Sequence, residues 1–101
     1  MLDRACISAV NLAEVASKLA EKGALEQQIR QTIRRLDVEI LDFDEDLAHR
    51  AGVLRQATLH AGLSLGDRAC LATAQRLGLR AVTTDRSWAD LKIGVEIQLL
   101  R

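Results

Sequence analysis

Apolar residues along the chain follow two different spacings. Short runs rich in apolar residues have the length of strands and lie at residues 5–7, 38–43, 81–84 and 95–100. The stretches between them have apolar residues at helical spacing and predict helices at residues 9–22, 25–36, 45–61, 65–77 and 86–91. Strands joined through helices in this way predict an α/β fold with a parallel sheet.

Residues 63–85 combine a small-residue helix, a glycine stop and a short apolar strand, with an acid at each end. Asp67 stands at the helix start and Asp85 just past the strand. Ligands of such folds bind at the carboxyl ends of the strands, where two carboxylates can hold a divalent cation. Each acid also has a structural interpretation. Ser64 and Asp67 have the spacing of a capping box, and Asp85 is placed to cap the next helix.

A third acid, Glu14, lies near the start of the first predicted helix, for which Ser8 is a good N-cap. This helix follows a strand, so Glu14 is expected near the same carboxyl edge as Asp85. The alternative is an exposed ion pair with Lys18, four residues later, which contributes a few tenths of a kcal/mol. Periodicity alone favours the ion pair.

Composition fits one globular domain spanning residues 1–101, with 49% apolar and 28% charged residues. Fourteen basic residues balance fourteen acids, so no overall positive field points to nucleic acid. Eleven of the basic residues are arginine, which suits phosphate contacts but equally reflects codon bias. Cys6 and Cys70 lie in apolar runs and are expected to be free thiols. Without a signal peptide or a long apolar run, the expected location is the cytoplasm, with no membrane partner.

Three segments, SAVNLAEV, LSLGDRACLATA and AVTTDRSW, together resemble the PIN-domain family. More narrowly, they are similar to the toxin ribonucleases of bacterial VapBC toxin–antitoxin pairs, in the family's order and over nearly the whole chain. The resemblance implies a three-layer α/β/α sandwich with a parallel sheet. It also implies RNA cleavage with Mg²⁺ or Mn²⁺ held by acids, which map to Glu14, Asp67 and Asp85 as catalytic and metal-binding residues.

The implied mechanism needs no histidine, serine or cysteine nucleophile. Clustered carboxylates repel one another unless a cation neutralises them. A metal-bound water can then attack a phosphodiester while the metal stabilises the departing oxygen. Arg68 and Arg86, next to two of the acids, are candidate contacts to RNA phosphates. The resemblance implies an RNA substrate and a cognate antitoxin as partners, and a homodimer is expected separately, from the incomplete sheet.

One departure from the family pattern concerns its first strand, which ends in an aspartate and occupies the middle of the sheet. The chain starts just before the family's second strand, and Asp3 precedes its strand, at the wrong edge to replace that acid. A shortened reading frame, a wrongly assigned start or a true truncated form are the possible origins. A non-catalytic remnant that binds an antitoxin or self-associates is therefore the alternative to an active Mg-dependent endoribonuclease.

Losing a central strand is expected to leave two half-sheets. Residues 5–7 would pair with 38–43, and residues 81–84 with 95–100. Each half-sheet would then expose the backbone of its apolar inner strand. Open edges are templates for pairing with another chain, because unpaired backbone groups are costly to bury. The inner strands are therefore expected either to pair directly or to be satisfied by exchange of segments between two chains, and the exchange is favoured.

Overall fold

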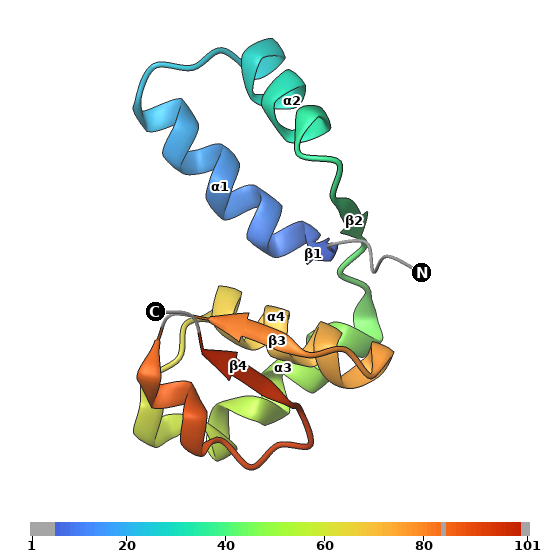
Figure 1. Cartoon of the computed structure of the whole chain (residues 1–101), viewed down its shortest axis with the longest axis vertical. Coiled ribbons are helices and arrows are strands. Elements are labelled where there is room, and N and C mark those ends of the chain that lie inside the picture. Colours follow the sequence, from blue (N-terminus) through green and yellow to red (C-terminus); the bar gives the residue numbers. More distant parts are fainter. Residues whose placement is uncertain (1–5, 84, 100–101) are drawn as a thin grey trace. The chain divides into compact units, whose positions relative to one another are not determined.

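The computed structural model describes residues 6–83 and 85–99. Three ends of the predicted strands, Ala5, Thr84 and Leu100, lie outside the described residues, as does Asp3. The chain alternates helices with four short strands, as the hydrophobic pattern predicts (Figure 1). In chain order, the elements are β1 (Cys6–Ser8), α1 (Ala9–Glu21), α2 (Glu26–Arg35), β2 (Glu39–Leu41), α3 (Glu45–Ala57), η1 (Leu59–Ala61), α4 (Leu65–Leu77), β3 (Ala81–Thr83), η2 (Arg86–Asp90) and β4 (Ile97–Leu99).

The chain divides into two compact units, Met1–Asp42 and Phe43–Arg101. The described strands form two separate two-stranded sheets, β1 with β2 and β3 with β4, and both pairs are parallel. Ile7 is in register with Ile40, and Val82 with Gln98. These are the two half-sheets that the sequence predicts. Each sheet lies in its own unit and each unit is described by itself, so direct pairing of the inner strands and exchange of segments between copies both stay predictions.

Side-chain caps begin two of the helices, α1 at the predicted Ser8 and α3 at Asp44. The Ser8 hydroxyl accepts a hydrogen bond from the Val10 amide at 3.1 Å, at the start of α1. Asp44 starts α3 in the same way, because its carboxylate accepts from the Leu47 amide at 3.0 Å. At the other end of α4, Gly78 adopts a φ of 65°, a left-handed conformation that glycine takes without strain.

The hydrophobic core lies in the second unit, where α3 packs against α4. Leu47 and Ala51 of α3 are fully buried, as are Leu71 and Ala72 of α4. The small residues of α4 allow this close approach, as the sequence predicts. Trp88 of η2 is 4% exposed and completes the cluster as the expected core anchor.

The first unit is built differently, although its helices are amphipathic. Neither α1 nor α2 contains a buried residue. Among the described residues of this unit, only Ser8 is buried. Apolar side chains remain well exposed, including Val15 at 39%, Leu36 at 58% and Leu25 at 68%. The αα-hairpin and its two strands therefore lack a fully buried apolar core within the described chain.

An ion pair that the sequence does not predict joins α4 to the start of α3. Arg76 Nη1 donates to both carboxylate oxygens of Asp44, at 2.9 and 2.8 Å, and lies 3.5 Å from Asp46. The pKa of Asp44 is lowered by its bond from the Leu47 amide and then by Arg76. Asp44 thus caps one helix and holds a second, although it lies 32 positions from Arg76.

Two sequence expectations for α3 are corrected. The helix was expected to run to Ala61, but it ends at Ala57 and a short 3-10 helix follows. Thr58, at φ −117°, leaves the helical conformation, while its buried hydroxyl donates to the Leu54 carbonyl at 2.7 Å. From the sequence alone, a glycine inside a predicted helix such as Gly52 indicates close packing, but Gly52 is exposed, and an added Cβ would meet nothing within 4 Å.

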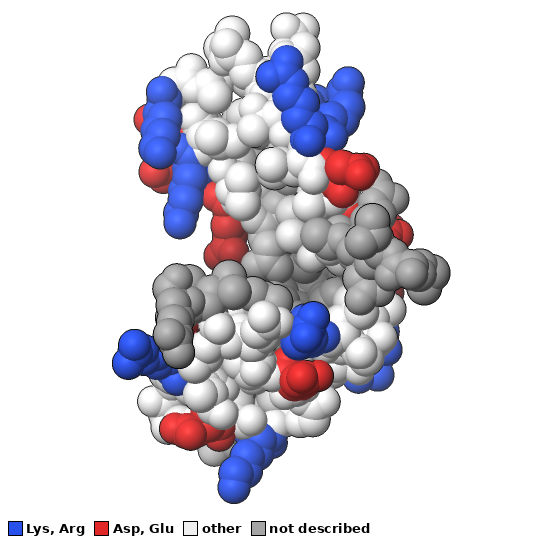
Figure 2. Space-filling view, viewed as in Figure 1, with Lys and Arg blue, Asp and Glu red and all other residues white. Residues whose placement is uncertain are grey.

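Charged side chains of both signs are interspersed over the visible face of each unit (Figure 2). No described helix is long and apolar enough to cross a membrane.

Replacing Gly52 by alanine is expected to stabilise the protein. The site is in the middle of α3 with open space around it, and alanine is favoured over glycine in a helix by about 1 kcal/mol. Urea unfolding followed by circular dichroism should show a higher midpoint with an unchanged slope. A lower midpoint would mean that the site is more crowded than the structure shows.

The Asp44–Arg76 pair is expected to make the free energy of unfolding decrease as the pH falls into the acid range. Because the pKa of Asp44 is lowered on folding, its contribution is present above the unfolded pKa and is lost as pH falls through the folded value. The denaturant midpoint of wild type should therefore decrease as the pH is lowered through this range. Asp44→Asn, which keeps a capping side chain, and Arg76→Ala should both fall less steeply with pH. Slopes equal to wild type in both variants would contradict this role.

Candidate metal site

Glu14 lies on the exposed surface of α1, in the first unit. The Asn11 side-chain amide donates to Glu14 Oε1 at 3.2 Å. The ion-pair alternative predicts Lys18 as the partner of Glu14. In the described part of the chain, the partner is Asn11 instead. This contact uses one of the two carboxylate oxygens of the exposed Glu14.

Asp67 is half-buried at the N-terminus of α4, in a complete capping box. Its amide donates to the Ser64 hydroxyl, and Asp67 Oδ2 accepts from the Ser64 amide, both at 3.1 Å. The structural interpretation of the Ser64–Asp67 spacing is therefore confirmed. Capping and metal binding do not exclude each other, because the capping bond occupies only Oδ2.

Asp85 follows β3 and caps η2, as the sequence predicts. Asp85 Oδ1 accepts from the Ser87 hydroxyl at 2.7 Å and from the Ser87 amide at 2.9 Å. These two bonds, the hydroxyl first, lower the pKa of Asp85. Its amide donates in turn to the Thr83 hydroxyl at 3.0 Å. Ser87 is a partner that sequence reasoning missed, although an Asp followed two residues later by Ser is a turn signal.

The donor set suits a hard divalent cation, since Mg²⁺ prefers a few carboxylates together with water. The structure does not assemble a full set by itself. Among residues 6–83 and 85–99, no group of three or more His, Cys, Asp or Glu side chains is placed to hold a metal ion. Glu14 belongs to the first unit and the two aspartates to the second. Each unit is described by itself, so the convergence of the three acids stays a prediction.

The two candidate phosphate-binding arginines occupy different environments. Arg68 is only 9% exposed, and its Nη1 donates to the Ala51 carbonyl of α3 at 2.9 Å. Its side chain thus contributes to the α3–α4 interface, and no hydrogen-bond partner among the described residues reaches its buried Nε. Arg86, the first residue of η2, is exposed beside Asp85. Arg86 is therefore better placed to meet a ligand from solvent.

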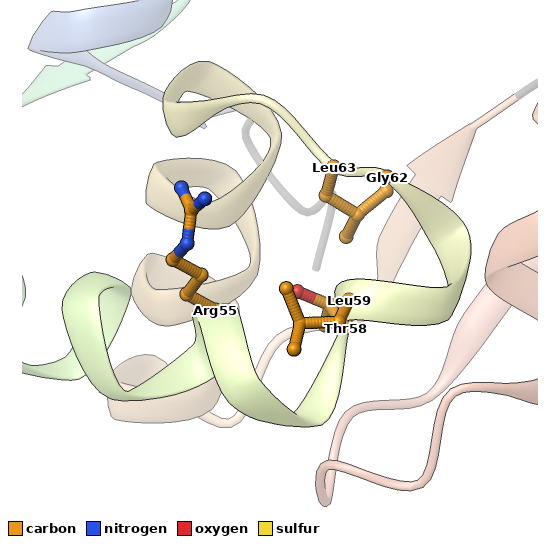
Figure 3. Close-up of a pocket in the computed structure, with 5 residues that line it drawn as sticks. All are labelled: Arg55, Thr58, Leu59, Gly62 and Leu63. Atoms are coloured by element: carbon orange, nitrogen blue, oxygen red, sulfur yellow. The ribbon is translucent and has the colours of Figure 1, made fainter.

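A pocket in the second unit lies at the end of α3 and along η1. It is lined by Arg55, Thr58, Leu59, Gly62 and Leu63 (Figure 3). None of these residues has a carboxylate, and the Thr58 hydroxyl already donates to a backbone carbonyl. The pocket therefore offers no carboxylate ligand to a cation.

The family assignment comes from comparison with known proteins. Residues 1–94 match the PIN domain family. This chain is a PIN domain. The recognition made from the three sequence segments is thus confirmed, and the α/β fold with parallel strands agrees with it. No curated protein matches the sequence.

Solved toxin–antitoxin complexes resemble this PIN domain over most of its length. DNA-bound VapBC from Salmonella typhimurium is 26% identical with a TM-score of 0.71, covering 92% of this chain and 73% of the other. A toxin–antitoxin complex from Klebsiella pneumoniae is also 26% identical, with a TM-score of 0.69. The match covers 96% of this chain and 79% of the other. VapBC2 from Rickettsia felis, bound to a promoter DNA fragment, is 20% identical with a TM-score of 0.73 and supports the fold. It covers 95% of this chain and 74% of the other.

The capping role of Ser64 can be separated from any ligand role of Asp67. Ser64→Ala removes the acceptor for the Asp67 amide and should cost about 1 kcal/mol of unfolding free energy. Asp67→Asn keeps a side chain that caps and should cost clearly less. Chemical unfolding in the presence of a chelator measures both. A larger loss for Asp67→Asn would show that the carboxylate contributes to stability beyond the capping box.

Proposed function

We propose that this PIN domain is a metal-dependent endoribonuclease, the toxin of a toxin–antitoxin pair. The observation that carries the proposal is the family match over residues 1–94. Glu14, Asp67 and Asp85 add to it, because the sequence resemblance maps them to the family's acidic positions. The similarity to solved VapBC complexes supports a toxin rather than another PIN protein.

In this proposal, Glu14, Asp67 and Asp85 hold Mg²⁺ or Mn²⁺. When bound, such an ion supplies an activated water and charge neutralisation for cleavage of an RNA phosphodiester bond. The bonds from Ser87 favour the anionic form of Asp85 and fix its carboxylate at the end of β3. The capping box holds the Asp67 carboxylate at the start of α4. Both side chains are thus oriented before any ligand arrives.

Arg86 is proposed to contact an RNA phosphate from the exposed side of η2. Arginine is well suited to this role because its planar guanidinium donates two parallel hydrogen bonds to phosphate oxygens. Arg68 is kept as a second candidate, through its buried Nε. A cognate antitoxin, implied by the resemblance, and a homodimer, expected from the incomplete sheet, complete the proposed set of partners. The cytoplasm is the proposed location.

The alternative is a non-catalytic module that binds an antitoxin or its own copy. The two proposals differ in whether the chain binds a divalent cation through these acids.

The enzyme proposal predicts weak Mn²⁺ or Mg²⁺ binding that depends on Asp67 and Asp85. Isothermal titration calorimetry should give a measurable heat for wild type and a reduced heat for Asp67→Asn and Asp85→Asn. Asp90→Asn, an exposed acid of η2, is the matched control and should behave as wild type. Equal heats from all four proteins would count against the metal site and favour the binding module.

Cleavage of a mixed RNA substrate in the presence of Mn²⁺ provides the second measurement. Wild type should cleave, Asp85→Asn should lose most of the activity, and added chelator should abolish it. Cation binding without any RNA cleavage would leave the site intact but contradict the ribonuclease.

A further inference from the structure

The buried arginine of α4 is a feature that the apolar core of the second unit does not explain. Arg68 is only 9% exposed, and its Nη1 donates to the carbonyl of the fully buried Ala51 at 2.9 Å. Arginine keeps its charge in proteins and is almost never fully buried unless it is paired. Among residues 6–83 and 85–99, no carboxylate forms an ion pair with Arg68, and no acceptor reaches its buried Nε.

Stability alone is a poor reason for an arginine at this position. A buried charge without a counter-ion carries a desolvation cost, and a hydrogen bond to one neutral carbonyl offsets only part of it. Replacing buried charges by apolar side chains of similar volume is often neutral or stabilising. A methionine, which has a similar length, would fill the same space without this cost. The guanidinium must therefore contribute something other than stability.

Arg68 holds the turn of the helix that carries Asp67. In α4, Gly66, Arg68 and Ala69 are buried, while Asp67 between them is half-buried. Successive residues of a helix lie about 100° apart around its axis, so the direction of the Asp67 carboxylate follows the rotation of this turn. Gly66 has no side chain and Ala69 has only a methyl group. Arg68 adds a directional hydrogen bond that ties the turn to the backbone of α3.

The capping box fixes Asp67 only relative to its own helix. Both of its bonds join Asp67 to Ser64, three residues earlier. Because neither bond reaches another element, the box does not resist a rotation or shift of α4 against α3. The bond from Arg68 to Ala51, 17 positions away, does resist it.

We propose that Arg68 is a positioning residue, which sets the direction of the Asp67 carboxylate by tying the first turn of α4 to α3. The inference rests on the proposed function in one respect, because Asp67 is the proposed ligand of Mg²⁺ or Mn²⁺. It differs from a phosphate contact by Arg68, because it acts on the protein before any RNA is present.

The variant Arg68→Met separates positioning from stability. Because methionine removes the buried charge, the urea midpoint should stay at or above that of wild type. Binding of Mn²⁺ without RNA, measured by calorimetry, should weaken about tenfold or more, as when other groups that orient a metal ligand are lost. Arg68→Lys keeps a charged donor and should recover part of the affinity. Arg55→Met removes an exposed arginine of α3 and is the matched control, with Mn²⁺ binding as in wild type.

Hydrogen exchange measured by NMR gives a readout that needs no metal. In Arg68→Met, the amides of Ser64 and Asp67 should exchange about tenfold faster than in wild type, because the capping box then belongs to a turn that opens more often. The amide of Gly78, which closes the other end of α4, should exchange as in wild type.

Three results would overturn the proposal. One is an Arg68→Met protein that is much less stable than wild type, which would make the arginine a purely structural residue. Another is exchange at Ser64 and Asp67 equal to wild type. The third is a variant with faster exchange and unchanged Mn²⁺ affinity. If wild type itself binds no Mn²⁺, the metal-site proposal fails separately, and the exchange rates alone decide whether Arg68 holds the turn.

Discussion

Close packing of α3 on α4 is the constraint on which the second unit depends. Alanines on both helices, among them Ala51 and Ala72, are fully buried and bring the two backbones together. Leu47 and Leu71 fill the remaining space. The position of α4 then determines two other features, because Asp67 stands at its first turn and β3 follows its glycine end. The candidate acids of this unit are thus placed by a core made almost entirely of small and aliphatic side chains.

Polar interactions at helix ends give the same acids a structural role. Asp67 accepts from the amide of Ser64, the N-cap residue of α4, and Asp85 accepts from an amide of η2. Asp44 accepts from an amide of α3 and also binds Arg76. A carboxylate at a helix N-terminus is stabilised by the unpaired amides and by the helix dipole. Such acids are held in one orientation, which also favours the binding of a cation. Capping therefore counts neither for nor against a metal site.

The contrast between the two units has a physical cause in how each buries its apolar residues. The second unit packs two helices and η2 around one cluster. In the first, α1 and α2 form a hairpin whose apolar residues are half-buried or exposed, beside two three-residue strands. Parallel strands normally lie inside a sheet with both faces covered. The first unit is the part of the chain with most to gain from a further partner.

Much of the local structure followed from the sequence alone. The caps at Ser8, Asp44, Ser64 and Asp85 and the stop at Gly78 were predictable, because capping depends on side chains within three residues of the amide that they bind. The pairing of the strands into two parallel half-sheets was also expected, although from the family resemblance rather than from periodicity.

Other features were decided only by the tertiary structure. Arg76 meets Asp44 across 32 positions, and Arg68 is buried against the Ala51 carbonyl, although its neighbour Asp67 suggested a ligand contact. Gly52 resembled a packing site but faces open space. In each case the outcome depends on which residues of another helix lie opposite, and this is set by the packing of α3 on α4 rather than by any local pattern.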